Sequence, residues 1–143
     1  MSLPDEASIE RLALRVLDQS LPKEKWTHAS HFALALWLLR YRQDLAAPDQ
    51  IRRVIIRYNE ATGTANTDSA GYHHTITLAS MRGAADQLRR LPPGGTLADA
   101  LAALMASRLG RSDWLLDYWR RGTLFSAAAR RDWVDPDLQP LPF

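Results

Sequence analysis

The four histidines of the chain are the residues whose type and spacing point most directly to chemistry. They fall in two pairs, His28 with His31 and His73 with His74. Neutral imidazole is a common ligand of transition metals, and one pair alone offers too few donors for a complete site. The pattern therefore favours a metal centre built from two separate segments of the chain.

Each histidine pair is predicted to lie at the start of a helix. Thr27 is a suitable N-cap before His28, and apolar residues then occupy almost every face of a helix up to about Arg42. The turn-forming segment Ala61 to Gly71 precedes the second pair, and we expect the next helix to run from near Tyr72 to about Arg90. Because a helix N-terminus disfavours positive charge, the imidazoles should be neutral and able to donate lone pairs.

Helix geometry sorts the histidines into a ligand set. His28 and His31 are three residues apart and lie on one face, whereas the neighbours His73 and His74 point about 100° apart on a helix. We predict that His28, His31 and His73 bind one divalent transition metal, Zn, Mn, Fe or Ni. Three protein ligands leave one position open for a water, which is the arrangement of a catalytic metal.

A metal-activated water would make the protein a metal-dependent hydrolase, and other polar residues then have supporting roles. His74 and Asp68 are the candidates for taking or donating a proton, with Glu60 as a further choice. Four residues are predicted to contact the substrate or to orient the ligand imidazoles: Asn59, Asn66, Tyr72 and Thr75.

Two other interpretations remain open, because histidines at helix starts often cap the backbone or bond to one another. The chain lacks the His-Glu-x-x-His and Glu-x-x-His patterns of familiar helical metal sites. In one alternative, the polar cluster and the loop Ala61 to Gly71 form a non-catalytic module that binds a small molecule or a partner protein. In the other, the histidines only fasten two helix ends together.

The composition argues against several classes of protein. The chain has no cysteine, so thiolate ligands and disulfides are excluded. Its 18 basic and 16 acidic side chains are too evenly balanced to predict nucleic-acid binding. The longest apolar run, Phe32 to Leu39, is too short to span a membrane, and Met1 to Glu10 has no apolar secretory core. We expect a cytoplasmic protein without nucleic-acid or membrane partners, either a monomer or a homo-oligomer.

Apolar residues recur at spacings of three and four, which predicts an all-α protein. We expect a single domain over residues 1–143, a compact bundle of four to five main helices with an irregular C-terminal segment packed across it. The other predicted helices are Asp5 to Gln19, Pro48 to Glu60, Thr96 to Leu109, Ser112 to Trp119 and Ser126 to Arg131. Trp133, Leu138, Leu141 and Phe143 should hold the C-terminal segment against the helices, because four large apolar groups would otherwise face water.

Three segments resemble motifs of a family of uncharacterised bacterial proteins. They are Trp26-Thr27-His28-Ala29-Ser30-His31, Gly71-Tyr72-His73-His74-Thr75, and the C-terminal stretch from Leu124-Phe125-Ser126 to Pro140-Leu141-Pro142. The family pattern has Thr-His-x-x-His and Tyr-His-Glu-Thr, so the resemblance implies a site that contains His28, His31, Tyr72, His73 and Thr75. His74 stands where the family has glutamate and cannot supply a carboxylate base. No activity is established for the family, so the resemblance implies a site and not a reaction.

Overall fold

Residues 5–143 are described by a computed structural model, and within them every regular element is a helix. The long helices are α1 (Glu6–Leu17), α2 (His28–Tyr41), α4 (Pro48–Ala61), α5 (His74–Arg90) and α6 (Leu97–Ala106). The short ones are α3 (Gln43–Ala46), α7 (Arg121–Leu124), α8 (Ala127–Arg131) and the 3₁₀ helices η1 (Lys23–Lys25), η2 (Arg108–Gly110) and η3 (Trp114–Asp117). The all-α prediction is confirmed. No helix within residues 5–143 has both the length and the apolar character needed to cross a membrane.

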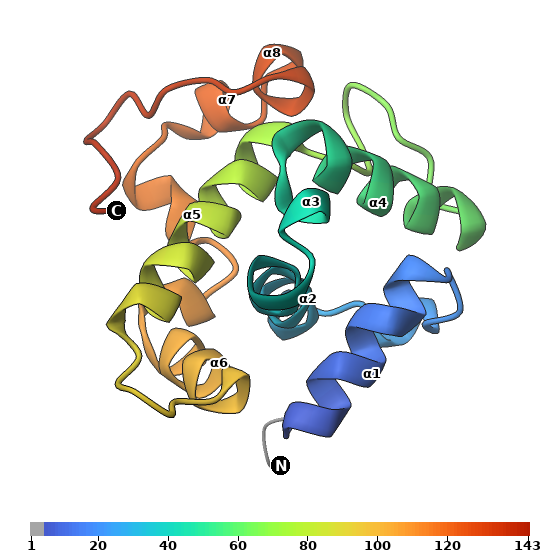
Figure 1. The fold of residues 1–143 in the computed structure, drawn as a ribbon. Coiled ribbons are helices and arrows are strands. Elements are labelled where there is room, and N and C mark those ends of the chain that lie inside the picture. The colour runs from blue at the N-terminus through green and yellow to red at the C-terminus, as the bar shows by residue number, and fades with distance from the viewer. Residues whose placement is uncertain (1–4) are drawn as a thin grey trace.

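Helix α2 lies at the centre of the core. Its residues Phe32 to Leu38 are all buried, as expected for a helix that is apolar on almost every face. Helices α1, α5 and α6 pack against it, and Figure 1 shows it between α1 on one side and α5 with α6 on the other. The packing of these helices fixes the position of α2. It therefore also fixes the position of the first turn of α2, which carries His28 and His31.

Several helix boundaries agree with the sequence predictions because local signals determine them. The Thr27 side chain accepts a hydrogen bond from the backbone N–H of Ser30 and caps α2. Pro48 occupies the first turn of α4, where its missing N–H costs nothing. Thr96 and Asp99 form a reciprocal capping box at the start of α6.

Other boundaries differ from the predictions. Helix α1 ends at Leu17, because the chain turns at Gln19, whose φ of 65° is not helical. Helix α5 begins at His74 instead of near Tyr72, with His73 as an extended N-cap. Helix α6 ends at Ala106 and is followed by η2, and the predicted helix from Ser112 to Trp119 is only the 3₁₀ turn η3. The short helices α3 and α7 were not predicted.

The C-terminal segment packs against the helices, as predicted, and backbone groups hold it there. The indole N–H of Trp119 donates to the carbonyl of Val134 at 2.9 Å, and the N–H of Leu138 donates to the carbonyl of Tyr118 at 2.9 Å. The Thr75 hydroxyl donates to the carbonyl of Asp132 at 2.8 Å and accepts from the N–H of Val134 at 3.1 Å. Figure 1 shows this segment leaving α8, passing α7 and ending beside α5.

The apolar side chains of the segment contribute unequally to this packing. Trp133, Leu141 and Phe143 pack partly buried against the core. Leu138, by contrast, is 48% exposed, so its predicted packing is wrong. Its backbone, and not its side chain, is what attaches this part of the segment.

Replacing Thr75 by valine should destabilise the protein by about 2 kcal/mol, because two backbone groups of the C-terminal segment lose their only side-chain partner in a buried place. Urea unfolding measures the effect. Thr64→Val is the matched control: Thr64 is partly exposed, and within residues 5–143 its hydroxyl has no hydrogen bond. The control should change the free energy of unfolding by less than about 0.5 kcal/mol. Equal effects of the two variants would contradict the role given to Thr75.

Candidate functional site

A cavity of about 310 Å³ lies beside the N-terminal half of α2. Its walls come from α2, α4, α5, the residue Trp26 before α2, and the segment 112–115. Most of the wall is apolar and includes Phe32, Ala35, Ile55, Met81 and Trp114. The polar residues of the wall are His28, His31, Thr77, Ser80 and Ser112. A concave, largely apolar space with a few convergent polar groups is the usual form of a small-molecule site.

The ring of His31 is held on two sides. Its Nδ1 lies 2.7 Å from the carbonyl oxygen of Thr27, one turn earlier, and its ring lies 3.8 Å from that of Trp26 between centroids, tilted by 31°. His31 lines the cavity and is exposed to solvent, although many protein atoms lie around its ring. Burial lowers the pKa of His31, and the nearby His28 lowers it further against the opposing effect of the Thr27 carbonyl.

The ring of His28 is held by a distant part of the chain. Its Nε2 lies 2.7 Å from the carbonyl oxygen of Leu109 in η2, and its ring stands perpendicular to Phe32 with 5.3 Å between centroids. A carbonyl oxygen can only accept, so Nε2 is the protonated nitrogen of the neutral ring. The bond therefore fixes both the tautomer of His28 and the position of η2 beside the cavity.

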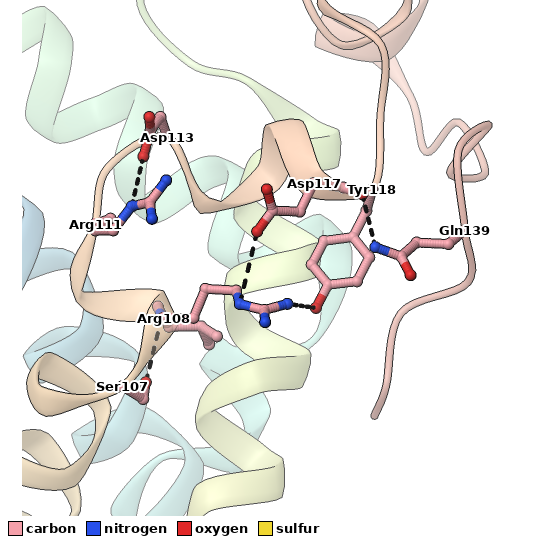
Figure 2. Close-up of polar contacts among 8 residues, drawn as sticks. Ser107, Arg108, Arg111, Asp113, Asp117, Tyr118 and Gln139 are labelled. Atoms are coloured by element: carbon pink, nitrogen blue, oxygen red, sulfur yellow. Dashed lines mark hydrogen bonds and ion pairs between the residues drawn. The ribbon is translucent and has the colours of Figure 1, made fainter.

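Polar contacts brace the segment that follows η2 and forms one wall of the cavity. Figure 2 shows Arg108 between Asp117, at 3.6 Å, and the hydroxyl of Tyr118, at 3.4 Å. Arg111 pairs with Asp113 at 3.2 Å, next to the wall residues Ser112 and Trp114. These are exposed ion pairs, which add little stability individually. The pair of Arg108 with Asp117 links η2 to η3.

The second histidine pair does not line the cavity. His73 is the N-cap of α5: its Nδ1 accepts from the N–H of Ile76 at 3.1 Å, and its Nε2 donates to the carbonyl of Leu124 at 2.6 Å. Both ring nitrogens are therefore used, and burial lowers the pKa of His73. The expectation that His73 lies on a helix face is wrong, because an extended N-cap points its side chain back over the first turn.

His74 is buried and paired with Tyr72. The phenol oxygen of Tyr72 lies 2.6 Å from Nδ1 of His74. Burial raises the pKa of Tyr72 to about 12, so the hydroxyl stays protonated at neutral pH and donates to the imidazole. Burial also lowers the pKa of His74, with the positive charge of Arg52 acting in the same direction. The pair is a neutral hydrogen-bonded unit beneath Arg52, whose guanidinium lies 5.6 Å from the Tyr72 ring.

Two of the predicted supporting residues brace the loop before α5. The amide of Asn59 donates to Oδ1 of Asn66 at 2.9 Å, and the same oxygen accepts from the N–H of Tyr72 at 3.0 Å. Gly71 has a φ of 79°, and a Cβ there would collide with the carbonyl of Ala65, so the loop requires glycine at this point. Asn59 and Asn66 thus hold the backbone of Tyr72, the residue that precedes the second histidine pair.

Asp68 and Thr75 make contacts to the C-terminal segment. Both carboxylate oxygens of Asp68 accept from the guanidinium of Arg131, whose charge holds the pKa of Asp68 below its usual value. Thr75 bonds to Asp132 and Val134, as described above. Neither residue lines the cavity. Thr75 and His73 join the second motif to the C-terminal motif, and Asp68 joins the preceding loop to the same C-terminal motif.

The structure thus separates the predicted ligand set. His28 and His31 share the cavity, whereas His73 bonds through both nitrogens to α5 and α7. Within residues 5–143, no three histidine, aspartate or glutamate side chains are grouped in a way that could hold a metal ion. Metal binding by His28, His31 and His73 stays a prediction that this arrangement does not favour.

Comparison of the chain with models of protein families, with curated proteins and with solved structures finds no match. The resemblance to a family of uncharacterised bacterial proteins therefore rests on the motifs themselves. The structure gives those motifs distinct places: the first lies at the cavity, and the second and the C-terminal one bond to each other.

Some residues of the cavity were not singled out in the sequence. Thr77, Ser80 and Ser112 line it, although nothing in their sequence surroundings distinguishes them from ordinary surface hydroxyls. The position of Trp26 could have indicated its role, because an apolar residue directly before the N-cap Thr27 often packs on the first turn of the helix. Its stacking on His31 follows from that position.

Replacing His73 by alanine should cost about 2–3 kcal/mol, because α5 loses its cap and the Leu124 carbonyl loses a buried donor. His73→Asn should cost roughly half as much, since asparagine is a good N-cap but is too short to bond Leu124. Urea unfolding of the two variants separates the two bonds. If both variants were as stable as the parent chain, the fastening role of His73 would be refuted.

The stability should fall as the pH drops below about 6.5. The pKa values of His31, His73 and His74 are lowered from 6.5 in the folded protein, so between the folded and unfolded values the unfolded chain binds more protons. The loss begins near the unfolded value and is complete below the folded ones. Unfolding free energies at pH 7.5 and pH 5.5 measure it, and His74→Gln should reduce the difference. A pH-independent stability over this range would contradict the assignment.

Proposed function

We propose that the protein is a binding module for a small, mainly apolar molecule that occupies the cavity beside α2. The cavity itself is the observation on which this proposal depends: about 310 Å³ of space bounded mostly by apolar side chains, with two histidines and three hydroxyl groups in its wall. A space of this size suits a compact bicyclic or short aliphatic molecule. Burial of apolar surface would supply the affinity, and the polar groups would orient the ligand.

The arrangement of the wall supports a preformed site. Trp26 is placed by its contact with His31 and by an edge-on contact with Tyr58 at 5.1 Å between centroids. Tyr58 is fully buried, and its hydroxyl donates to the carbonyl of Leu21 at 2.9 Å. Because these contacts are between the protein's own residues, they hold this part of the wall in place independently of any ligand, and less of the binding free energy would be lost to ordering.

A metal-dependent hydrolase is less well supported by the same geometry. Its third ligand, His73, has no free nitrogen, and its proposed base Asp68 is paired with Arg131. A hydrolase would need His73 to break its bonds to Ile76 and Leu124. The binding module needs no such rearrangement.

Titration of the ¹⁵N-labelled protein with 2-naphthol, a compact bicyclic probe, tests the proposal by NMR. The largest shifts are expected for amides of the cavity wall, such as those of Ala35, Thr77 and Ser80. At about 100 times its Kd the probe should also raise the Tm by roughly 5–10 °C. Shifts spread over the whole surface, or no binding at all, would refute the proposed site.

A cavity-filling variant sharpens the test. Ser80→Phe places a ring in the cavity and should weaken 2-naphthol binding by at least about tenfold while the fold is kept, because the probe and the new ring compete for one space. Ser69→Phe makes the same substitution on an exposed loop and should leave the affinity unchanged. The proposal fails if Ser80→Phe folds, as judged by its NMR spectrum, and binds the probe as tightly as the parent chain.

A further inference from the structure

The two histidines of the cavity are fixed in complementary tautomers by backbone carbonyls. Nδ1 of His31 lies 2.7 Å from the oxygen of Thr27, and Nε2 of His28 lies 2.7 Å from the oxygen of Leu109. Carbonyl oxygens only accept hydrogen bonds, so each of these nitrogens is protonated. In a neutral ring, the other nitrogen then has a lone pair and no proton. Those nitrogens are Nε2 of His31 and Nδ1 of His28.

Neither of these two nitrogens has a hydrogen-bond partner among residues 5–143. Both rings belong to the wall of the cavity. Both residues lie in the first turn of the 14-residue helix α2, whose dipole places positive partial charge at this end. Burial and the proximity of His28 lower the pKa of His31. Two residues that each carry an unpartnered ring nitrogen therefore belong to the wall of the cavity.

The rest of the wall provides no charge to balance an anion. Among the described residues that line the cavity there is no lysine, arginine, aspartate or glutamate. The remaining polar groups are the hydroxyls of Thr77, Ser80 and Ser112, which can donate or accept. The Thr77 hydroxyl is already used, because it donates to the carbonyl of His73 at 2.8 Å. A carboxylate in this space would lose its hydration and gain no cation in return.

We infer that the cavity selects neutral apolar molecules that present a hydroxyl or N–H donor, such as phenols, alcohols and indole-like amines, and rejects carboxylates of the same shape. This inference rests on the proposed binding function and adds the chemical class of the ligand. The donor group would bond to Nε2 of His31 or Nδ1 of His28, and the hydrocarbon part would fill the space between Phe32, Ile55 and Met81.

Three probes of nearly equal shape test the inference: 2-naphthol, its methyl ether 2-methoxynaphthalene, and 2-naphthoate. At pH 7.5, isothermal calorimetry or NMR titration should show 2-naphthol binding about tenfold more tightly than the ether, the difference made by one net hydrogen bond. The carboxylate should bind more weakly than the ether.

The variant His31→Phe keeps an aromatic ring against Trp26 but removes the acceptor nitrogen. It should reduce the affinity for 2-naphthol to about that of the ether and leave the affinity for the ether nearly unchanged. His28→Phe is the second variant, used in the same way, so that a folding defect in one does not decide the result. The inference is supported if at least one variant loses affinity for 2-naphthol but not for the ether. It is overturned if neither variant shows such a loss.

The remaining outcomes separate the inference from the function on which it rests. Equal affinities for 2-naphthol and the ether would overturn the selectivity and leave the binding module standing. Tight binding of 2-naphthoate would also overturn the selectivity. Binding of none of the three probes would overturn both. Stoichiometric binding of Zn²⁺ that displaces 2-naphthol and requires both histidines would assign the lone pairs to a metal and overturn the inference in favour of a metal site.

Discussion

The burial of α2 on nearly all sides is the constraint on which the rest of the structure depends. A helix that is apolar from Phe32 to Leu38 must be covered by other helices, and α1, α5 and α6 provide that cover. The cavity lies beside the N-terminal half of α2, where Trp26, α4, α5 and residues 112–115 form the rest of its wall. The first turn of α2 brings His28 and His31 into that wall.

Hydrogen bonds to backbone carbonyls divide the histidines by role. His73 uses both nitrogens and fastens the start of α5 to α7, whereas His28 and His31 each use one. His74 gives one nitrogen to a buried tyrosine. The chemical capacity of each ring is therefore set by the number of nitrogens that the fold leaves free. Three rings, those of His28, His31 and His74, thus keep one nitrogen without a partner among residues 5–143. Of these, only His28 and His31 line the cavity, whereas His74 is buried away from it.

The sequence predicted the helical class, the caps at Thr27 and Thr96, and the N-terminal proline of α4, because these depend on residues within one turn of each other. It also indicated that all four histidines lie at helix starts. It could not predict that His73 is a cap and not a helical residue, since the two readings differ by one position. Nor could it show the acceptors at Leu109 and Leu124, because carbonyls from distant segments leave no mark in a residue pattern.

The bonds of the second motif to the C-terminal part of the chain have a consequence for the order of assembly. His73 bonds to residue 124, and Thr75 bonds to residues 132 and 134, so the contacts close loops of more than fifty residues. During synthesis, α2 and α5 are made before those partners. The start of α5, and with it the cavity wall formed by the residues that follow His73, can make its full set of contacts only after residues 124–134 have been made.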